Sequence, residues 1–305
     1  MEKLIYPEKG KLQFSIRKVV WLYFMVIPCF FIDFNQITLK VFVLGSFLTL
    51  ITICFGHSIG LHRGVIHKSY NTSNWMRNIL VYLFVLTGLG GPLSWLKLHY
   101  YRDYWQNKKD CPKYFAYEHS LLKDFWWNLH LSFQSDDIKK YQIPQTDLQN
   151  KWFIWLEKTW YLHNLVLALV IYLMFDFNTM LLLVFFRSSL TILGHWYIGY
   201  ASHKYGYSHF KILGAKESAF NDVLLGIISF GEGYHNNHHA HPTSANFGVK
   251  WYEFDLGWQM IKLLRKLQFI RDVKNHEGGN TLKESAERRP KILCRLPLVG
   301  KKLTM

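Results

Sequence analysis

The sequence predicts an all-α integral membrane protein, with four transmembrane helices in two hairpins and a helical cap on the cytoplasmic side. Three observations lead to this fold class. Half of the 305 residues are hydrophobic, the apolar residues gather in long runs that few charges interrupt, and 15 histidines lie mostly near the ends of these runs. Neither a solvated surface nor a lipid-facing helix needs so many imidazoles, so the histidines require a separate explanation.

Composition excludes several other classes of protein. An aromatic share of 17% argues against a disordered or fibrous chain. The cysteines at positions 29, 54, 111 and 294 form no CxxC pair, which argues against a disulfide scaffold or a thiolate metal site. The formal net charge of +15 indicates a basic surface beside the membrane.

Four apolar runs approach the roughly 20 residues that cross a bilayer. Residues 19–32 and 41–61 form the first hairpin, and residues 162–175 and 180–203 form the second. Arg187 is the one charge inside a span. A further run, 79–96, contains Thr87 and several glycines that would break a regular helix, so we expect it to be only partly embedded. Residues 223–230 are too few to span.

The distribution of basic residues predicts the orientation. Lys11, Arg17 and Lys18 precede the first span, whereas Lys40 is the only basic residue in either hairpin turn. The positive-inside rule then places both termini, and segments 62–161 and 203–305, in the cytoplasm. We expect one membrane-embedded domain over residues 1–275 and a basic cytoplasmic tail over residues 276–305. No cleavage site follows the first run, so we do not expect a secretory signal.

The strongest local signal is the segment FGEGYHNNHHAHP. His235, His238 and His239 stand at i, i+3 and i+4, so one helical turn presents all three imidazoles together. Three imidazoles on one face suit a transition metal.

A second signal, GHSIGLHRGVIH, lies at the cytoplasmic end of the second span. His57 and His62 are five residues apart, roughly 140° on an ideal helix, so they would flank a metal pair from two sides or use a distorted helix end. His67 continues the pattern as an outer residue. The neighbouring Arg63 and Lys68 would bind an anionic head group or be interfacial cations.

Two further groups complete the set. His195, Gly199 and His203 lie along one face of the last span. His203, nearer the cytoplasmic end, is the better candidate ligand. His195 is either a ligand or a buried hydrogen-bonding residue. His99 and Asp103 stand one turn apart in LHYYRD, so both could meet one ion, or Asp103 could instead pair with Arg102.

The donor set indicates iron. It holds many imidazoles, no thiolate and one candidate carboxylate. Zinc is usually satisfied by four ligands, whereas roughly seven or eight nitrogen donors indicate two ions with open positions for oxygen.

The order of these segments, HSIGLH, HYYRD and HNNHH, resembles the membrane-bound fatty acid desaturase family, and within it the acyl-CoA desaturase branch. The likeness covers roughly residues 15 to 275. It includes GPLSW before His99 and, most specifically, SFGEGYHNNHHAHPTSANFG followed by KWYEFDLGW.

The resemblance implies an oxygen-dependent desaturase that removes two hydrogens from an acyl chain held in an apolar tunnel, with two iron ions and O2. The positions that match the family's ligands are His57, His62, His99, His203, His235, His238 and His239. It also implies an acyl-CoA or acyl-lipid substrate, membrane lipid and a separate electron-donor protein as partners, and no nucleic acid.

Two positions depart from the family's pattern. The family's middle box reads HRxHH, whereas Arg102 and Asp103 stand here where two imidazoles are expected, and Gly199 replaces a frequent Asn. We expect Asp103 and His195 to compensate as further ligands. The alternatives are a related di-iron hydroxylase and a non-catalytic lipid-binding member of the fold.

Overall fold

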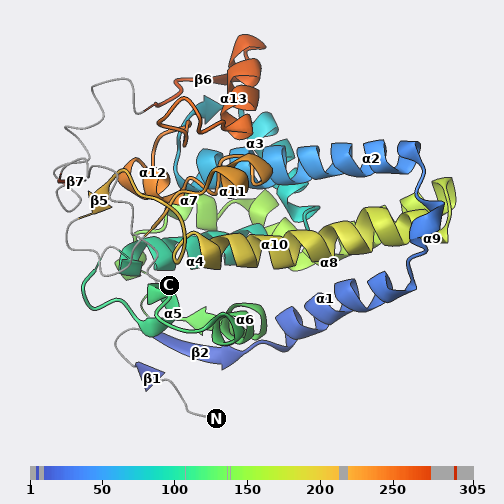
Figure 1. Cartoon of the computed structure of the whole chain (residues 1–305), viewed down its shortest axis with the longest axis horizontal. Coiled ribbons are helices and arrows are strands. Elements are labelled where there is room, and N and C mark those ends of the chain that lie inside the picture. The colour runs from blue at the N-terminus through green and yellow to red at the C-terminus, as the bar shows by residue number, and fades with distance from the viewer. Residues whose placement is uncertain are drawn as a thin grey trace, which may run out of the picture.

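The computed structural model describes residues 5–6, 10–106, 108–135, 137, 139–212, 219–275 and 292–293. This part of the chain is mostly helical (Figure 1). Long helices extend together as an arm, and shorter elements gather around its other end. Cys294 and the predicted tail, apart from Ile292–Leu293, lie outside the described residues.

The first hairpin contains one short helix and one helix that is long and apolar enough to span a membrane. Helix α1 covers Ile16–Val26 and continues as the 3-10 helix η1, Ile27–Phe31, because Pro28 lacks the N–H that an α-helix needs. The return helix begins as α2, Leu39–Thr49, and continues without a break as the π-helix η3, Leu50–Ile66. The continuous helix Leu39–Ile66 has 28 residues and a mean hydropathy of 2.0, long and apolar enough to cross a membrane.

The second hairpin follows the same plan. Helix α8 covers Lys151–Met174, and the short α9, Phe177–Met180, leads through the π-helix η5, Leu181–Phe186, into α10, Arg187–Ala201. The helix Phe177–Ala201, with a mean hydropathy of 1.5, is the second that is long and apolar enough to span. Helix α8 is long enough but carries Glu157 and Lys158 within its first half. Length and hydropathy alone therefore support two of the four predicted spans.

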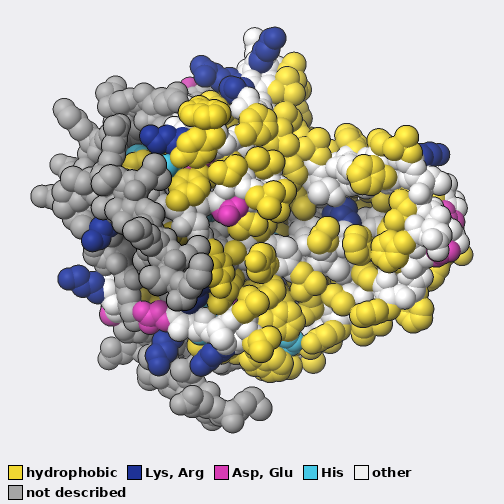
Figure 2. Space-filling view, in the orientation of Figure 1, with side chains coloured by type: hydrophobic (Ala, Val, Ile, Leu, Met, Phe, Trp, Pro, Cys, Tyr) yellow, Lys and Arg dark blue, Asp and Glu magenta, His cyan; other side chains and the backbone are white. Residues whose placement is uncertain are grey.

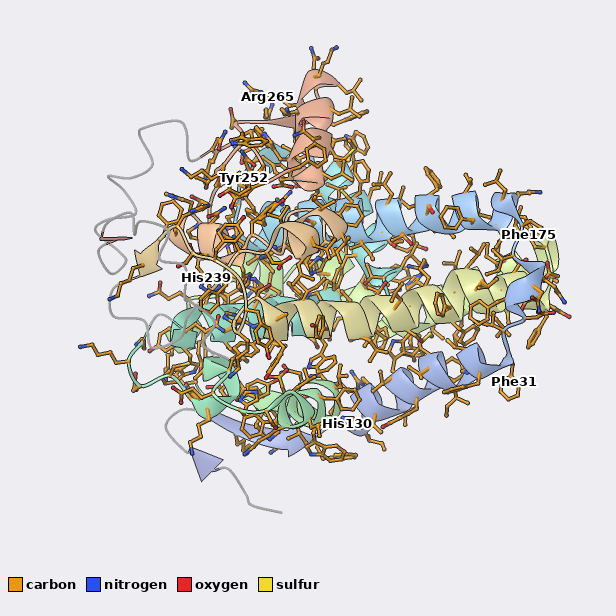
Figure 3. All side chains as sticks on the ribbon, in the orientation of Figure 1. Phe31, His130, Phe175, His239, Tyr252 and Arg265 are labelled. Atoms are coloured by element: carbon orange, nitrogen blue, oxygen red, sulfur yellow. The ribbon has the colours of Figure 1, made fainter. Side chains whose placement is uncertain are left out.

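The far end of the arm carries polar side chains at its two turns, among them the exposed Asp33 and Asp176, and these turns hold it together. Asp33 N–H donates to Asn178 Oδ1 at 2.9 Å, and Asn178 Nδ2 donates to Asp33 O at 3.0 Å, so the two hairpin turns bind each other. Figure 2 shows apolar side chains along the arm, with basic side chains concentrated toward its other end. Phe31 and Phe175 lie near this tip, opposite His239 (Figure 3).

The single charge predicted inside a span is buried and fully engaged. Arg187 donates to Leu183 O at 2.9 Å, to Thr52 Oγ1 at 3.1 Å and to Leu86 O at 2.8 Å. Three oxygens from three segments therefore replace its hydration, and the residue joins the hairpins to the segment between α3 and α4.

The run at 79–96 is broken, as predicted. Helix α3 covers Asn74–Val85 and α4 covers Pro92–Gln106. Between them Gly88 has φ +82° and Gly90 has φ +121°, values that favour glycine. Glu157 of α8 then fixes the start of α4, because its carboxylate accepts the N–H groups of Leu93 at 2.9 Å and Ser94 at 3.0 Å.

The cap is not entirely helical, which departs from the all-α prediction. Strands β1 (Ile5–Tyr6), β2 (Gly10–Phe14) and β4 (Leu131–Gln134) form an antiparallel sheet in the order β1-β2-β4; β3 (Asn71–Thr72) pairs with β6 (Ile270–Arg271), and β5 (Lys211–Ile212) with β7 (Ile292–Leu293). These strands are short, and all the pairs except β1–β2 join residues far apart in the chain, so local patterns do not reveal them.

The remaining helices surround the ends of η3 and α10. They are α5 (Lys113–Ala116), α6 (Leu121–His130), α7 (Gln145–Leu148), α11 (Val223–Ile228), α12 (His235–Ala240) and α13 (Leu256–Lys266), with 3-10 turns η2 (Phe34–Gln36) and η4 (Lys139–Tyr141). Helix α12 is the helical turn predicted for HNNHH, and His203 follows the last residue of α10.

Candidate metal centre

Four buried histidines form one compact group. His62 and His67 come from η3 and the segment after it, His99 from α4 and His238 from α12; one nitrogen from each lies within 4.8 Å of the others. The ring centroids of His238 lie 4.7 Å from His62 and 4.5 Å from His67, and His99 closes the group at 4.8 Å from His62. We call these four residues the first group.

The π-helix explains why histidines five residues apart can share a site. In η3 the backbone bonds run from residue i+5 to residue i, and His67 N–H donates to His62 O at 3.0 Å. Residues five apart therefore lie nearly above one another, rather than roughly 140° apart as on an α-helix. The rings of His62 and His67 are 4.7 Å apart.

Three more histidines form a second group. His203 follows α10, and His235 and His239 lie one turn apart on α12. The Nε2 atom of His235 is 3.1 Å from that of His203 and 3.1 Å from that of His239, so the three nitrogens converge on one point. His239 lies at the cap end of the molecule in Figure 3.

The ring nitrogens suit a bound cation. His62 Nε2 and His238 Nδ1 are buried and have no hydrogen-bond partner among the described residues. Burial, and then the neighbouring imidazoles, hold the pKa of His235 and His238 well below the ordinary value, so both rings are neutral and offer lone pairs. The residues present therefore fit metal ions, with imidazole as the donor.

Glu232, which the sequence reasoning missed, orients a member of the first group. Its Oε2 is 2.7 Å from His62 Nδ1, and its Oε1 accepts from the Ser58 hydroxyl at 2.6 Å. A carboxylate on one imidazole nitrogen fixes the tautomer and leaves the other nitrogen for the metal. Glu232 stands in GEGYH, three residues before His235, and this position in the sequence could have indicated its role beside the metal centre.

Replacing Glu232 with Gln is expected to weaken metal binding at the first group by about 10- to 100-fold, because the outer carboxylate no longer holds His62 in the ligating tautomer. Ser58→Ala should have a smaller effect in the same direction. Metal titration of the purified protein measures both, with the exposed Glu118→Gln as the control. Unchanged affinity in Glu232→Gln would remove this role.

The segment WYEFD, residues 251–255, holds α12 in place through hydrogen bonds to Glu253. Glu253 accepts hydrogen bonds from Asn237 Nδ2 at 2.9 Å and Tyr207 Oη at 2.7 Å, and its Oε1 is 3.0 Å from His209 Nε2. Asn237 Nδ2 also donates to Phe247 O at 2.9 Å. The two asparagines of HNNHH therefore face the scaffold, which leaves the three histidines for the groups.

A cavity of about 530 Å³ lies between α1, α4, α8 and α10. Its wall includes Trp21, Leu22 and Ile192, and two further lining residues connect it to the metal centre. Trp95 has its ring centroid 5.5 Å from that of His99, and the Tyr117 ring stacks on His203 at 4.1 Å. The cavity therefore borders both groups.

The other predicted site residues lie beside the groups. His57 is outside both; its ring is 4.9 Å from that of His195, and His195 lines the cavity with Gly199. The Asp103 carboxylate is 3.3 Å from His99 Nδ1. Within the described residues it forms no ion pair with Arg102, which lines the cavity instead.

The prediction that Arg63 binds an anionic head group is wrong. Arg63 is fully buried and forms an ion pair with Asp255, with Nη2 3.0 Å from Oδ2. It also donates to Phe230 O at 3.1 Å, and its guanidinium lies 4.0 Å from the centre of the Phe247 ring. Lys68 is exposed.

Two imidazole groups at the ends of long apolar helices, next to a cavity, are the arrangement expected of a membrane-associated metal-binding protein. The pattern of the fatty acid desaturase family matches residues 38–267, and the chain belongs to that family. It is therefore a fatty acid desaturase.

Curated relatives agree with this assignment. The chain is 30% identical over 231 residues to an sn-1 stearoyl-lipid 9-desaturase of Synechocystis sp., covering 74% of this chain and 70% of the relative. It is 31% identical to an sn-2 palmitoyl-lipid 9-desaturase of Nostoc sp., covering 72% and 76%. An acyl-CoA C20 Delta5-desaturase of Anemone leveillei is 26% identical, covering 74% and 72%. These names do not favour the hydroxylase or the non-catalytic alternative.

Proposed function

We propose that the chain introduces a double bond into a fatty acyl chain, carried by CoA or by a membrane lipid, with two iron ions and O2. The observation that carries the proposal is the juxtaposition of two imidazole groups with one cavity that is lined by both apolar and charged side chains. Iron suits neutral nitrogen donors that leave positions open for oxygen. The relatives, which act on acyl-lipids or acyl-CoA, support the substrate class.

The ligand assignment follows the two groups. His62, His67, His99 and His238 would hold one ion, and His203, His235 and His239 would hold the other. In this assignment His67 would be a ligand in place of His57, which we predict as a ligand from the sequence. His57 and His195 would lie outside the ligand sets, between the first group and the cavity.

The protein's own residues would position the substrate and exclude water. When bound, iron supplies the redox chemistry by which O2 becomes a strong oxidant. The apolar walls, including Trp21 and Ile192, would hold the acyl chain, and Trp95 and Tyr117 would set the distance between that chain and the two groups.

The electron balance requires a partner. Removing two hydrogens from the chain provides two electrons, whereas reducing O2 to two waters consumes four. Two further electrons would come from a separate donor protein and two protons from the solvent, and the basic residues near the cap suit an acidic surface on that donor.

The same proposal covers the topology. Residues 1–275 would form the catalytic domain with four spans, and residues 276–305 a basic tail, with both termini and the metal centre in the cytoplasm. Helices α1 with η1 and α8 would complete the two hairpins, because both hairpin turns meet at the far end of the arm.

Lipid profiling tests the proposed function. Cells that express the chain are expected to gain unsaturated acyl chains, and purified protein should contain close to two irons. A His238→Ala variant should return the profile to that of cells without the chain, because it removes one imidazole from the first group. His241→Ala, three residues away and outside both groups, is the matched control. Iron without new unsaturation would contradict the proposal.

A further inference from the structure

Gln106, at the end of α4, is a buried polar residue whose side chain has one atom without a hydrogen-bond partner among the described residues. Its side chain is fully buried. The amide nitrogen donates to Phe115 O at 3.1 Å and lies 3.4 Å from His203 Nε2. The amide oxygen is buried and accepts no hydrogen bond from the described residues.

The hydrogen bond to Phe115 fixes which end of the amide is which. A backbone carbonyl only accepts, so the atom facing Phe115 O must be the N–H end. The atom without a hydrogen-bond partner is therefore the amide oxygen. A buried acceptor that no protein donor satisfies calls for another partner, such as an ion.

The helix places this amide beside the second group. His99, Asp103 and Gln106 stand at i, i+4 and i+7 on α4, which is one face of a helix. His99 at one end belongs to the first group, and Gln106 at the other end reaches His203 of the second. The same helical face therefore runs from one group to the other.

We propose that the amide oxygen of Gln106 is a fourth protein ligand of the second metal, which then has three imidazoles and one amide oxygen. The inference rests on the proposed function, because it assumes that both groups hold metal. The amide nitrogen stands 3.4 Å from His203 Nε2, and the oxygen is bonded to the same carbon, so the oxygen lies next to the second group while the nitrogen donates to Phe115 O. A neutral amide oxygen is a harder donor than imidazole, so the two sites differ in affinity and the second releases a transition metal more easily.

Cobalt titration of purified full-length protein in detergent tests the assignment. Co²⁺ reports ligand changes through its visible absorption, independently of enzyme activity. Wild-type protein is expected to bind two equivalents in two separable steps. Gln106→Ala should weaken the second step by about tenfold or more and leave the first unchanged. His239→Ala identifies the second step, and His67→Ala identifies the first.

The variant Gln106→Glu distinguishes a metal-ligand role of Gln106 from a purely structural role. A carboxylate at the same position is a stronger ligand, so the second step should tighten and its cobalt spectrum should shift. If Gln106 served only to donate to Phe115, the glutamate would face a carbonyl and bind cobalt no more tightly than alanine does. That result, or an unchanged second step in Gln106→Ala, overturns the inference. Failure of wild-type protein to bind at either step overturns the proposed function, and this inference with it.

Discussion

Replacing Gly199 with leucine is expected to abolish desaturation while leaving the bound metal in place. Gly199 lines the cavity, and a Cβ built there meets only the Tyr117 hydroxyl at 4.0 Å, so the longer side chain would extend into the space proposed for the acyl chain. The backbone is helical at this position, and leucine favours a helix over glycine by about 1 kcal/mol. The fold should therefore tolerate the change.

Gly194→Leu provides the matched control. Gly194 lies on the same helix, a built Cβ meets nothing within 4 Å, and the residue does not line the cavity. We expect Gly194→Leu to keep both activity and metal, and Gly199→Leu to lose about 100-fold or more of product at unchanged metal content, as a misplacement of the reacting atoms does. Equal activity in the two variants would show that the acyl chain does not occupy this cavity.

The largest effect on stability is expected at the ion pair between Arg63 and Asp255. Asp255→Asn leaves the buried guanidinium without a counter-charge, which costs about 3–5 kcal/mol of unfolding free energy. Asp255 also accepts the N–H groups of Phe247 and Trp258, both at 2.9 Å, so the change loosens the segment after α12 and the start of α13. Denaturation in detergent, followed by helix content, measures the loss.

The same chemical change at an exposed position provides the comparison. Asp272 is exposed and accepts from Asn71 Nδ2, so Asp272→Asn should alter stability by less than about 0.5 kcal/mol. A double variant, Arg63→Met with Asp255→Leu, should recover much of the loss, because it removes both charges together. A single variant as stable as the wild type would mean that the pair is not buried in the folded protein.

The sequence was sufficient for features that depend on local patterns. The break between α3 and α4 follows from the residues at 87–92, and the helical turn at His235 from its i, i+3, i+4 spacing. The ends of the helices follow similarly: Ser15, Thr38 and Ser73 each cap the helix that follows by accepting a backbone N–H.

The choice between His57 and His67 could not be made from spacing. Both stand five residues from His62, and a period of 3.6 excludes neither. Only the packing of α4 and α12 against η3 decides that His67 contacts His99 and His238, while His57 faces His195. The role that we propose for Gln106 is also invisible in the sequence, because the burial of its amide depends on contacts with Phe115 and His203.

The metal centre contains an α-helix and a π-helix, and the type of helix decides how many residues separate two histidines that meet. In the α-helix α12, His235 and His239 meet with three residues between them, whereas in the π-helix η3, His62 and His67 meet with four. A single deletion between His62 and His67 would therefore demand an ordinary α-helix there to keep the pair together. The number of residues between two paired histidines therefore depends on whether the backbone forms an α-helix or a π-helix. A search for related enzymes should let this number and the helix type change together.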